Sequence, residues 1–172
     1  MSKQVAVVIT KLFEDVEFTS PKEELEKAGH AVTTIGFEAG ETVDGKKGTA
    51  SVKIDKSIDE VSPDNFDALL IPGGFSPDQL RKDDRFLAFT KAFSDHKKPI
   101  FSICHGPQLL INAEVVKGKD ITAVKQVAVD LKNAGAHFHD KEVVIDDSGL
   151  ISSRTPDDLP AFNQAMVNAL SE

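Results

Sequence analysis

The sequence has one cysteine, no long apolar run and no excess of positive charge, and each shortage excludes a class of protein. A single cysteine among 172 residues cannot form an intrachain disulfide, which predicts a reducing, cytoplasmic location. About 18 consecutive apolar residues occur nowhere, and the first residues lack the pattern of a secretory signal. The formal net charge of −8 argues against a nucleic-acid partner. We therefore expect neither a membrane-spanning nor a secreted nor a nucleic-acid-binding chain.

Cofactor and metal motifs are scarce as well. Neither a Gly-x-Gly-x-x-Gly fingerprint nor a P-loop is present, so the sequence carries no nucleotide signature. His137 and His139 have a spacing that allows two metal ligands on one face of a strand. Without a clear third ligand, they are more typical of surface residues. We predict no cofactor and no metal.

The chain alternates between patterns of strands and helices. Its 172 residues, of which 40% are apolar, suit one domain over residues 1–172, because no internal repeat or linker divides them. Strands are predicted at residues 5–9, 32–37, 68–71, 100–103, 120–124, 142–145 and 150–152, and a small hairpin at 42–54. Helices are predicted from residue 20 to 28 and at 85–93, 127–134 and 159–170. This order predicts an α/β fold, a doubly wound, mostly parallel sheet with helices on both faces.

The only cysteine follows one of these strands directly. Pro99 opens the apolar run 100–103, Cys104 ends it, and His105-Gly106-Pro107 leads into a helix, since proline suits the first helical position. Strand, sharp turn and helix are the parts of a nucleophile elbow, here with cysteine in place of serine and Gly106 two residues later. The N-terminus of the helix would lower the thiol pKa. A buried, inert cysteine is the alternative.

Two other segments are expected at the same edge of the sheet. Ligand sites of doubly wound sheets lie beyond the carboxyl ends of the strands, where residues 14–17 and 72–78 also fall. The N–H groups of Gly73, Gly74 and the elbow are candidates for an oxyanion hole, although an ordinary glycine turn explains the pair equally well. Glu17 would oppose a thiolate unless its carboxyl is protonated and donates to the sulfur. Its alternative is a solvated acid in a first helical turn.

Four motifs now carry a family resemblance. They are Phe13-Glu14-Asp15-Val16-Glu17, Asp67-Ala68-Leu69-Leu70-Ile71-Pro72-Gly73-Gly74, Ser102-Ile103-Cys104-His105-Gly106-Pro107-Gln108 and Ser152-Ser153-Arg154-Thr155-Pro156-Asp157-Asp158-Leu159. With these motifs in this order, the chain resembles the ThiJ/PfpI superfamily, PfpI-type branch, nearly from end to end. The resemblance implies a flavodoxin-like fold, related to class I glutamine amidotransferases and assembled at least as a homodimer.

The resemblance also implies roles for individual residues. It makes Cys104 the nucleophile, Glu17 the carboxyl bonded to it and His105 the neighbouring base. A third triad member reaches in from the adjacent subunit; PfpI-type proteases have glutamate there, and the matching residue here is Asp78. Glutaminase chemistry itself is not expected, because the amidotransferases use a later His-x-Glu and this sequence contains none.

The predicted function is therefore a cysteine-dependent stress-response enzyme. The resemblance implies an intracellular peptidase or amidase, or a glyoxalase III or protein deglycase acting on methylglyoxal and glycated groups. Its substrate would be a small carbonyl compound or a peptide, attacked by Cys104. Two alternatives remain open: a redox-sensing or chaperone-like stress protein whose Cys104 is oxidised rather than catalytic, and a purely structural oligomer.

Overall fold

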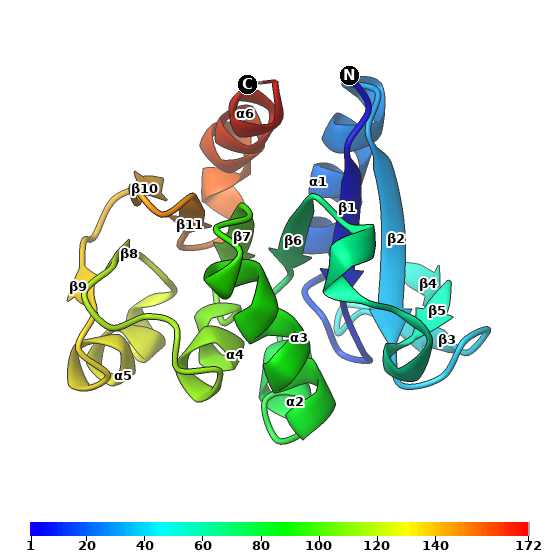
Figure 1. Ribbon diagram of the computed structural model, residues 1–172, viewed down its shortest axis with the longest axis horizontal. Coiled ribbons are helices and arrows are strands. Elements are labelled where there is room, and N and C mark those ends of the chain that lie inside the picture. Colours follow the sequence, from blue (N-terminus) through cyan, green and yellow to red (C-terminus); the bar gives the residue numbers. More distant parts are fainter. Residues whose placement is uncertain (172) are drawn as a thin grey trace.

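A seven-stranded sheet forms the centre of the computed structural model, which describes residues 1–171 (Figure 1). Its spatial order is β10-β11-β7-β6-β1-β2-β5. The strands are β1 (Gln4–Val8), β2 (Ala31–Gly36), β5 (Lys56–Ser57), β6 (Ala68–Ile71), β7 (Ile100–Ile103), β10 (Val144–Ile145) and β11 (Leu150–Ser153). All neighbouring pairs are parallel except β10 and β11, which form an antiparallel hairpin at one edge. The predicted doubly wound, mostly parallel sheet is confirmed.

Helices cover both faces of this sheet. They are α1 (Asp15–Lys27), α2 (Ser76–Leu80), α3 (Asp84–Asp95), α4 (Pro107–Asn112), α5 (Ala128–Asn133) and α6 (Leu159–Leu170). Apolar side chains of α2, α3, α4 and α5 share one buried cluster, and those of α1 and α6 share a second one on the other face. Figure 1 shows α3 in front of the sheet, with α2 and α4 below the strands in this view. Within residues 1–171, no helix combines the length and the apolar character needed to cross a membrane.

The central strand β1 explains why there are two cores. Val5 and Val7 belong to the cluster beneath α1 and α6, whereas Ala6 and Val8 belong to the cluster beneath α3 and α4. All four side chains are fully buried. A strand covered on both faces needs apolar residues at every position, because side chains alternate between the faces. The continuous apolar run near the N-terminus follows from this requirement.

Two small sheets lie outside the main one. β3 (Thr42–Asp44) and β4 (Ser51–Lys53) form the predicted antiparallel hairpin, whose loop contains the Asp-Gly turn signal. β8 (Asp120–Ile121) and β9 (His137–Phe138) pair in parallel. The strand predicted over residues 120–124 is therefore shorter than expected, because only its first two residues find a partner.

Two further expectations about helices are wrong. α1 begins at Asp15, not after Ser20, so Pro21 lies inside the helix and cannot donate to the carbonyl of Glu17. Residues 72–78 were predicted as a loop, but Ser76 begins α2, with Pro77 in its first turn and Asp78 next to it. Glu17 and Asp78 thus both lie near the N-terminal ends of helices rather than on loops.

Phe162 offers a test of how strongly α6 holds the sheet. Its side chain is fully buried in the cluster that also contains Cys104. Phe162→Ala should lower the free energy of unfolding by about 3–5 kcal/mol, because it leaves a cavity and loses apolar burial. Urea denaturation measures the change. Val129→Ala on α5, where the side chain is 57% exposed, is the control and should cost less than about 0.5 kcal/mol. Equal effects of the two changes would contradict this packing.

Candidate active site

Cys104 lies on a strained elbow. It follows β7 directly and has a φ of 61°, a left-handed conformation that is uncommon outside glycine. Its N–H donates to the Ser153 carbonyl at 3.1 Å, and its carbonyl accepts from the Val124 N–H at 3.1 Å. These hydrogen bonds fix the turn from both sides. The predicted nucleophile-elbow geometry is therefore present, with Cys104 buried at 8% exposure.

Gly106 allows the chain to turn so sharply. A β-carbon at this position would lie 2.6 Å from the Ser102 hydroxyl oxygen and 2.8 Å from the Ile71 carbonyl oxygen. Its N–H donates to the Ile103 carbonyl at 2.9 Å. Gly106 therefore serves close packing between the elbow and β6, and its amide is not free for a substrate.

Glu17 reaches the sulfur from the first turns of α1. It is completely buried, and its Oε1 accepts a hydrogen bond from the Gly73 N–H at 2.9 Å. Burial raises the pKa of Glu17 from 4.5 to about 8, and the neighbouring Glu14 charge adds to the rise, against the opposing hydrogen bond from Gly73. The carboxyl is accordingly protonated at neutral pH. The prediction that Glu17 lies beside Cys104 with a raised pKa is consistent with this geometry, and the solvated alternative is not.

The thiol itself departs from expectation. Burial raises the pKa of the Cys104 thiol to about 12, and the Glu17 charge is the second cause. The N–H groups of Gly74 and His105 act in the opposite direction, since both interact with the sulfur. The predicted lowering of the thiol pKa is therefore wrong: a short elbow helix does not outweigh desolvation. The Glu17 charge raises the pKa of the Cys104 thiol, whereas a hydrogen bond with Cys104 lowers the pKa of Glu17, so the two groups titrate as a coupled pair.

His105 is the neighbour of the sulfur. Its Nδ1 lies 3.3 Å from Cys104 Sγ. Burial lowers the pKa of His105, the Lys46 charge lowers it further, and Asp78 opposes both. A neutral imidazole at neutral pH is able to accept a proton from the thiol. The geometry thus supports the role of base that was expected for His105.

The two glycines after β6 direct their amides to different groups: Gly73 to the Glu17 carboxyl and Gly74 to the Cys104 sulfur. The Gly73 N–H is already bound to Glu17, and a β-carbon on Gly73 would lie 2.8 Å from the Cys104 β-carbon. Gly74 has a φ of 74°, and a β-carbon there would collide with the backbone of Glu14. The expectation that Gly73 supplies an oxyanion-hole donor is not supported, because its amide is occupied. Gly74 and His105 are the residues whose amides face the sulfur.

Asp78 does not join the other residues within one chain. Its side chain is 65% exposed and lies 3.8 Å from the Arg81 guanidinium. Among the described residues, no hydrogen bond links it to His105. The carboxylate is near enough to influence the pKa of that imidazole but does not orient it.

One segment of the site was missed by sequence reasoning. The loop 45–50 between β3 and β4 packs on residues 12–15, and its Lys46 ammonium lies 3.2 Å from the Glu14 carboxylate and 5.5 Å from the centre of the Phe75 ring. The Asp-Gly signal located the hairpin correctly. Nothing in the pattern indicated that its loop would place a lysine charge close enough to influence the pKa of His105.

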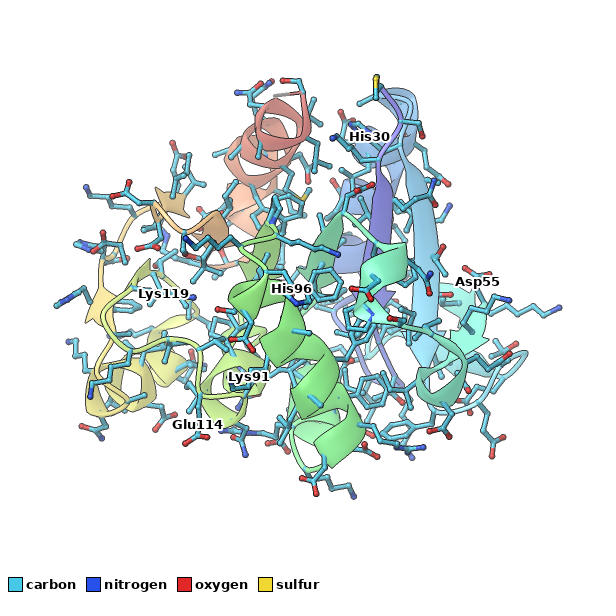
Figure 2. The ribbon with its side chains drawn as sticks, viewed as in Figure 1. His30, Asp55, Lys91, His96, Glu114 and Lys119 are labelled. Carbon is cyan, nitrogen blue, oxygen red and sulfur yellow. The ribbon has the colours of Figure 1, made fainter. Side chains whose placement is uncertain are left out.

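The other histidines and Arg154 of the last motif have structural positions and contacts and are not part of the candidate active site. His139 pairs with Asp120 at 2.8 Å, and His137 lies beside it on β9. His30 precedes β2 and lies near the N-terminus of the chain, far from the elbow, while His96 ends α3 (Figure 2). The Arg154 guanidinium donates two hydrogen bonds to the Asp158 carboxylate, from Nε to Oδ2 at 2.9 Å and from Nη2 to Oδ1 at 3.0 Å. Within residues 1–171, no group of three or more metal-ligating side chains gathers.

A pocket of about 600 Å³ opens over α5. Its walls come from α5, from β9 and from the segments after β8, β9 and β11, and include Ala123, Val129, Phe138 and Arg154. Cys104 is not part of its lining, but the neighbouring Val124 is hydrogen-bonded to the Cys104 carbonyl. The pocket is therefore linked to the elbow through this backbone hydrogen bond.

The raised pKa of Glu17 predicts a particular pH dependence of stability. The folded chain binds a proton at Glu17 that the unfolded chain has released, so the free energy of unfolding should fall as pH rises from about 4.5 to 8. Glu17→Gln should make this fall shallower. Denaturant titrations across the range measure it. Glu23→Gln, a change at a largely exposed residue of the same helix, is the control and should keep the wild-type slope. Identical slopes for wild type and Glu17→Gln would show that Glu17 is not protonated by folding.

Two curated proteins are similar in sequence to this chain over nearly its whole length. "Protein/nucleic acid deglycase 2" of Escherichia coli (strain K12) is 62% identical over 170 residues, covering 99% of both chains. "General stress protein 18" of Bacillus subtilis (strain 168) is 56% identical over 172 residues, covering 100% of both.

A solved structure is similar as well. A two-domain protein from Anabaena variabilis with DJ-1/ThiJ/PfpI-like and ferritin-like domains matches with a TM-score of 0.95 and 36% identity. The match covers 98% of this chain and 48% of the two-domain protein, so this chain corresponds to about half of its length. The model of the DJ-1/PfpI family matches residues 3–169. With this match over nearly its whole length, the chain belongs to the DJ-1/PfpI family.

Proposed function

We propose that this chain is a cysteine-dependent enzyme that attacks carbonyl groups, with glycated side chains and α-oxoaldehydes such as methylglyoxal as its substrates. The observation that carries the proposal is the strained Cys104, whose sulfur lies 3.3 Å from a neutral imidazole. Backbone strain of this kind persists only where the surrounding structure enforces it, and it is concentrated at functional sites. A buried structural cysteine needs neither the strain nor the neighbouring base.

The first step follows from the arrangement. The Cys104 sulfur forms a bond to the carbonyl carbon, its proton passes to His105 Nδ1, and the carbonyl oxygen becomes an alkoxide. The alkoxide then takes that proton and a hemithioacetal results. The Gly74 and His105 amides, which face the sulfur, are suited to stabilise the developing negative charge. Because the thiol pKa is raised, proton loss accompanies carbon–sulfur bond formation instead of preceding it.

Glu17 makes this step easier by being neutral. Below a pH of about 8 its carboxyl holds a proton, so it does not repel negative charge on the adjacent sulfur. A protonated carboxyl is also a hydrogen-bond donor. We assign Glu17 to donate to the sulfur as charge develops there.

The relatives favour the deglycase activity. The Escherichia coli relative is named as a deglycase of proteins and nucleic acids, and the Bacillus subtilis relative as a general stress protein. Glycated nucleotides therefore belong among the substrates to be tested, although the net charge of −8 predicts no stable complex with nucleic acid. The peptidase or amidase activity remains the second candidate, because the same elbow attacks an amide carbonyl. The redox-sensing or chaperone-like role is the third.

Assembly is the other part of the proposal. We place a second copy of the chain against α2, so that Asp78 of that copy orients His105. The support is that Asp78 is exposed and unbonded to His105 in its own chain, next to a Phe75 side chain that is 56% exposed. An apolar ring beside an exposed acid suits an interface between subunits.

Removing the nucleophile tests the activity. Cys104→Ala should abolish turnover of methylglyoxal and of a glycated peptide, whereas His105→Gln should reduce it by roughly 10²–10⁴-fold, as loss of a general base does. Both substrates and an unmodified, unstructured peptide are assayed with the purified proteins. Turnover that survives Cys104→Ala would refute the proposal. No turnover by the wild type, with rapid peroxide oxidation of Cys104 seen by mass spectrometry, would favour the sensor.

Mixing variants tests the role of Asp78. If it acts across the interface, Cys104→Ala and Asp78→Ala chains, dissociated and reassembled together, should regenerate about a quarter of the sites with both wild-type residues. Asp78→Ala alone should keep some activity, because an acid that orients a base costs less to remove than the nucleophile. The measured quantity is the gain over the average of the separate variants. No gain, with mixed dimers confirmed by native mass spectrometry, would mean that Asp78 does not act across subunits.

A further inference from the structure

Asp15 is a buried carboxylate that the proposed chemistry does not use. It lies in the first turn of α1, two residues before Glu17, and is 1% exposed. All its partners belong to the loop 45–50. The Lys47 N–H donates to Oδ1 at 2.9 Å, the Thr49 and Ala50 N–H groups donate to Oδ2 at 2.9 Å, and the Thr49 hydroxyl donates to Oδ2 at 3.1 Å. The loop backbone is thus wrapped around one side chain of α1.

The fit of the loop around Asp15 is close. A β-carbon on Gly45 would collide with the carboxylate, so the residue that begins the loop has to be glycine. Burial by itself would raise the pKa of Asp15, but the hydrogen bonds from the loop outweigh it and lower the pKa. The carboxylate therefore stays ionised, which keeps all four hydrogen bonds charge-assisted.

The loop 45–50 also contains Lys46, whose backbone and ammonium group both have fixed partners. The Lys46 N–H donates to the Phe13 carbonyl at 2.8 Å, and its ammonium pairs with Glu14. Phe75, over whose ring the ammonium lies, follows the Gly74 amide that faces the sulfur. A lysine on an exposed hairpin loop would normally sample many positions, because its side chain is long and flexible. Here both its backbone and its head group are fixed.

We propose that Asp15 is a positioning residue of the site: by fastening the loop 45–50 to α1, it holds the Lys46 ammonium between Glu14 and Phe75 and so fixes a positive charge beside the segment that carries Gly74. The inference rests on the role of His105 as base in the proposed function. It assigns a purpose to a carboxylate that touches neither the sulfur nor the imidazole.

The charges that act on His105 come from several elements. Lys46 on the loop 45–50 favours the neutral imidazole, whereas Asp78 on α2 favours the protonated one. Cys104 lies beside the ring, with Glu17 beyond it. Glu14 is paired with both Lys46 and Lys47, so either single lysine variant leaves it one partner.

The sign of the effect separates positioning from a direct charge effect. Loss of the Asp15 negative charge would by itself lower the pKa of His105, because a nearby carboxylate stabilises an imidazolium. Loss of Lys46 from its place would raise that pKa. An upward shift in Asp15→Asn therefore reports displacement of the loop.

The experiment follows the titration of His105 by NMR in histidine-labelled protein, with the signal assigned by its loss in His105→Gln. We expect the His105 pKa to shift upward in Asp15→Asn and in Lys46→Met. The double variant should shift no further than Lys46→Met alone, since Asp15 acts through Lys46. Lys47→Met is the matched control: this side chain is 60% exposed and pairs with Glu14 from the same loop, and its loss should leave the titration in place.

A downward or absent shift in folded Asp15→Asn would overturn the inference, as would additive shifts in the double variant. Far-UV circular dichroism establishes folding. If Asp15→Asn does not fold, Thr49→Val, which removes only the side-chain hydrogen bond to Asp15, is titrated instead, and an unmoved His105 pKa there overturns the inference. The titration does not depend on turnover. A wild type without Cys104-dependent activity would therefore refute the proposed function and not the placement of Lys46.

Discussion

The contact between the buried Glu17 carboxyl and the Cys104 thiol constrains the rest of this structure. Two acidic groups removed from water can lie together only if at least one keeps its proton. The Gly73 N–H satisfies one carboxyl oxygen, and the glycine has no side chain because Cys104 and Glu17 occupy the space. The start of α1, the turn after β6 and the elbow after β7 are all placed by this contact. Packing alone would have been served better by apolar residues.

Sheet topology brings these pieces together. β1, β6 and β7 are neighbours in the sheet and run parallel, so the segments that follow them emerge side by side. The sequence predicted this because its buried strands are continuous apolar runs bounded by glycine and proline. It also predicted the elbow, since Pro99 opens the apolar run that ends at Cys104, and Gly106 and Pro107 are typical of a turn that leads into a helix.

Tertiary contacts decided what the sequence pattern could not. The Ser-Pro signal at residues 20–21 resembles a helix start, but α1 begins earlier, at Asp15, where the loop 45–50 satisfies the carboxylate. The direction of the thiol pKa shift depends on burial, which local spacing does not report. Lys46 was missed because its neighbours in space, Glu14 and Phe75, are about 30 residues away on either side of it. Local patterns located the elements and the nucleophile, and long-range contacts located the environment of the nucleophile.

The hydrogen bond from the Cys104 N–H to Ser153 has a consequence for biosynthesis. β11, which carries Ser153, pairs with β7 but is made almost 50 residues later. A nascent or C-terminally truncated chain lacks this one of the two partners of the Cys104 backbone, and we expect the cysteine there to relax to an ordinary backbone conformation. In such chains we expect an accessible, unselective thiol. Completion of the last parallel strand is the event that turns a vulnerable cysteine into a protected one.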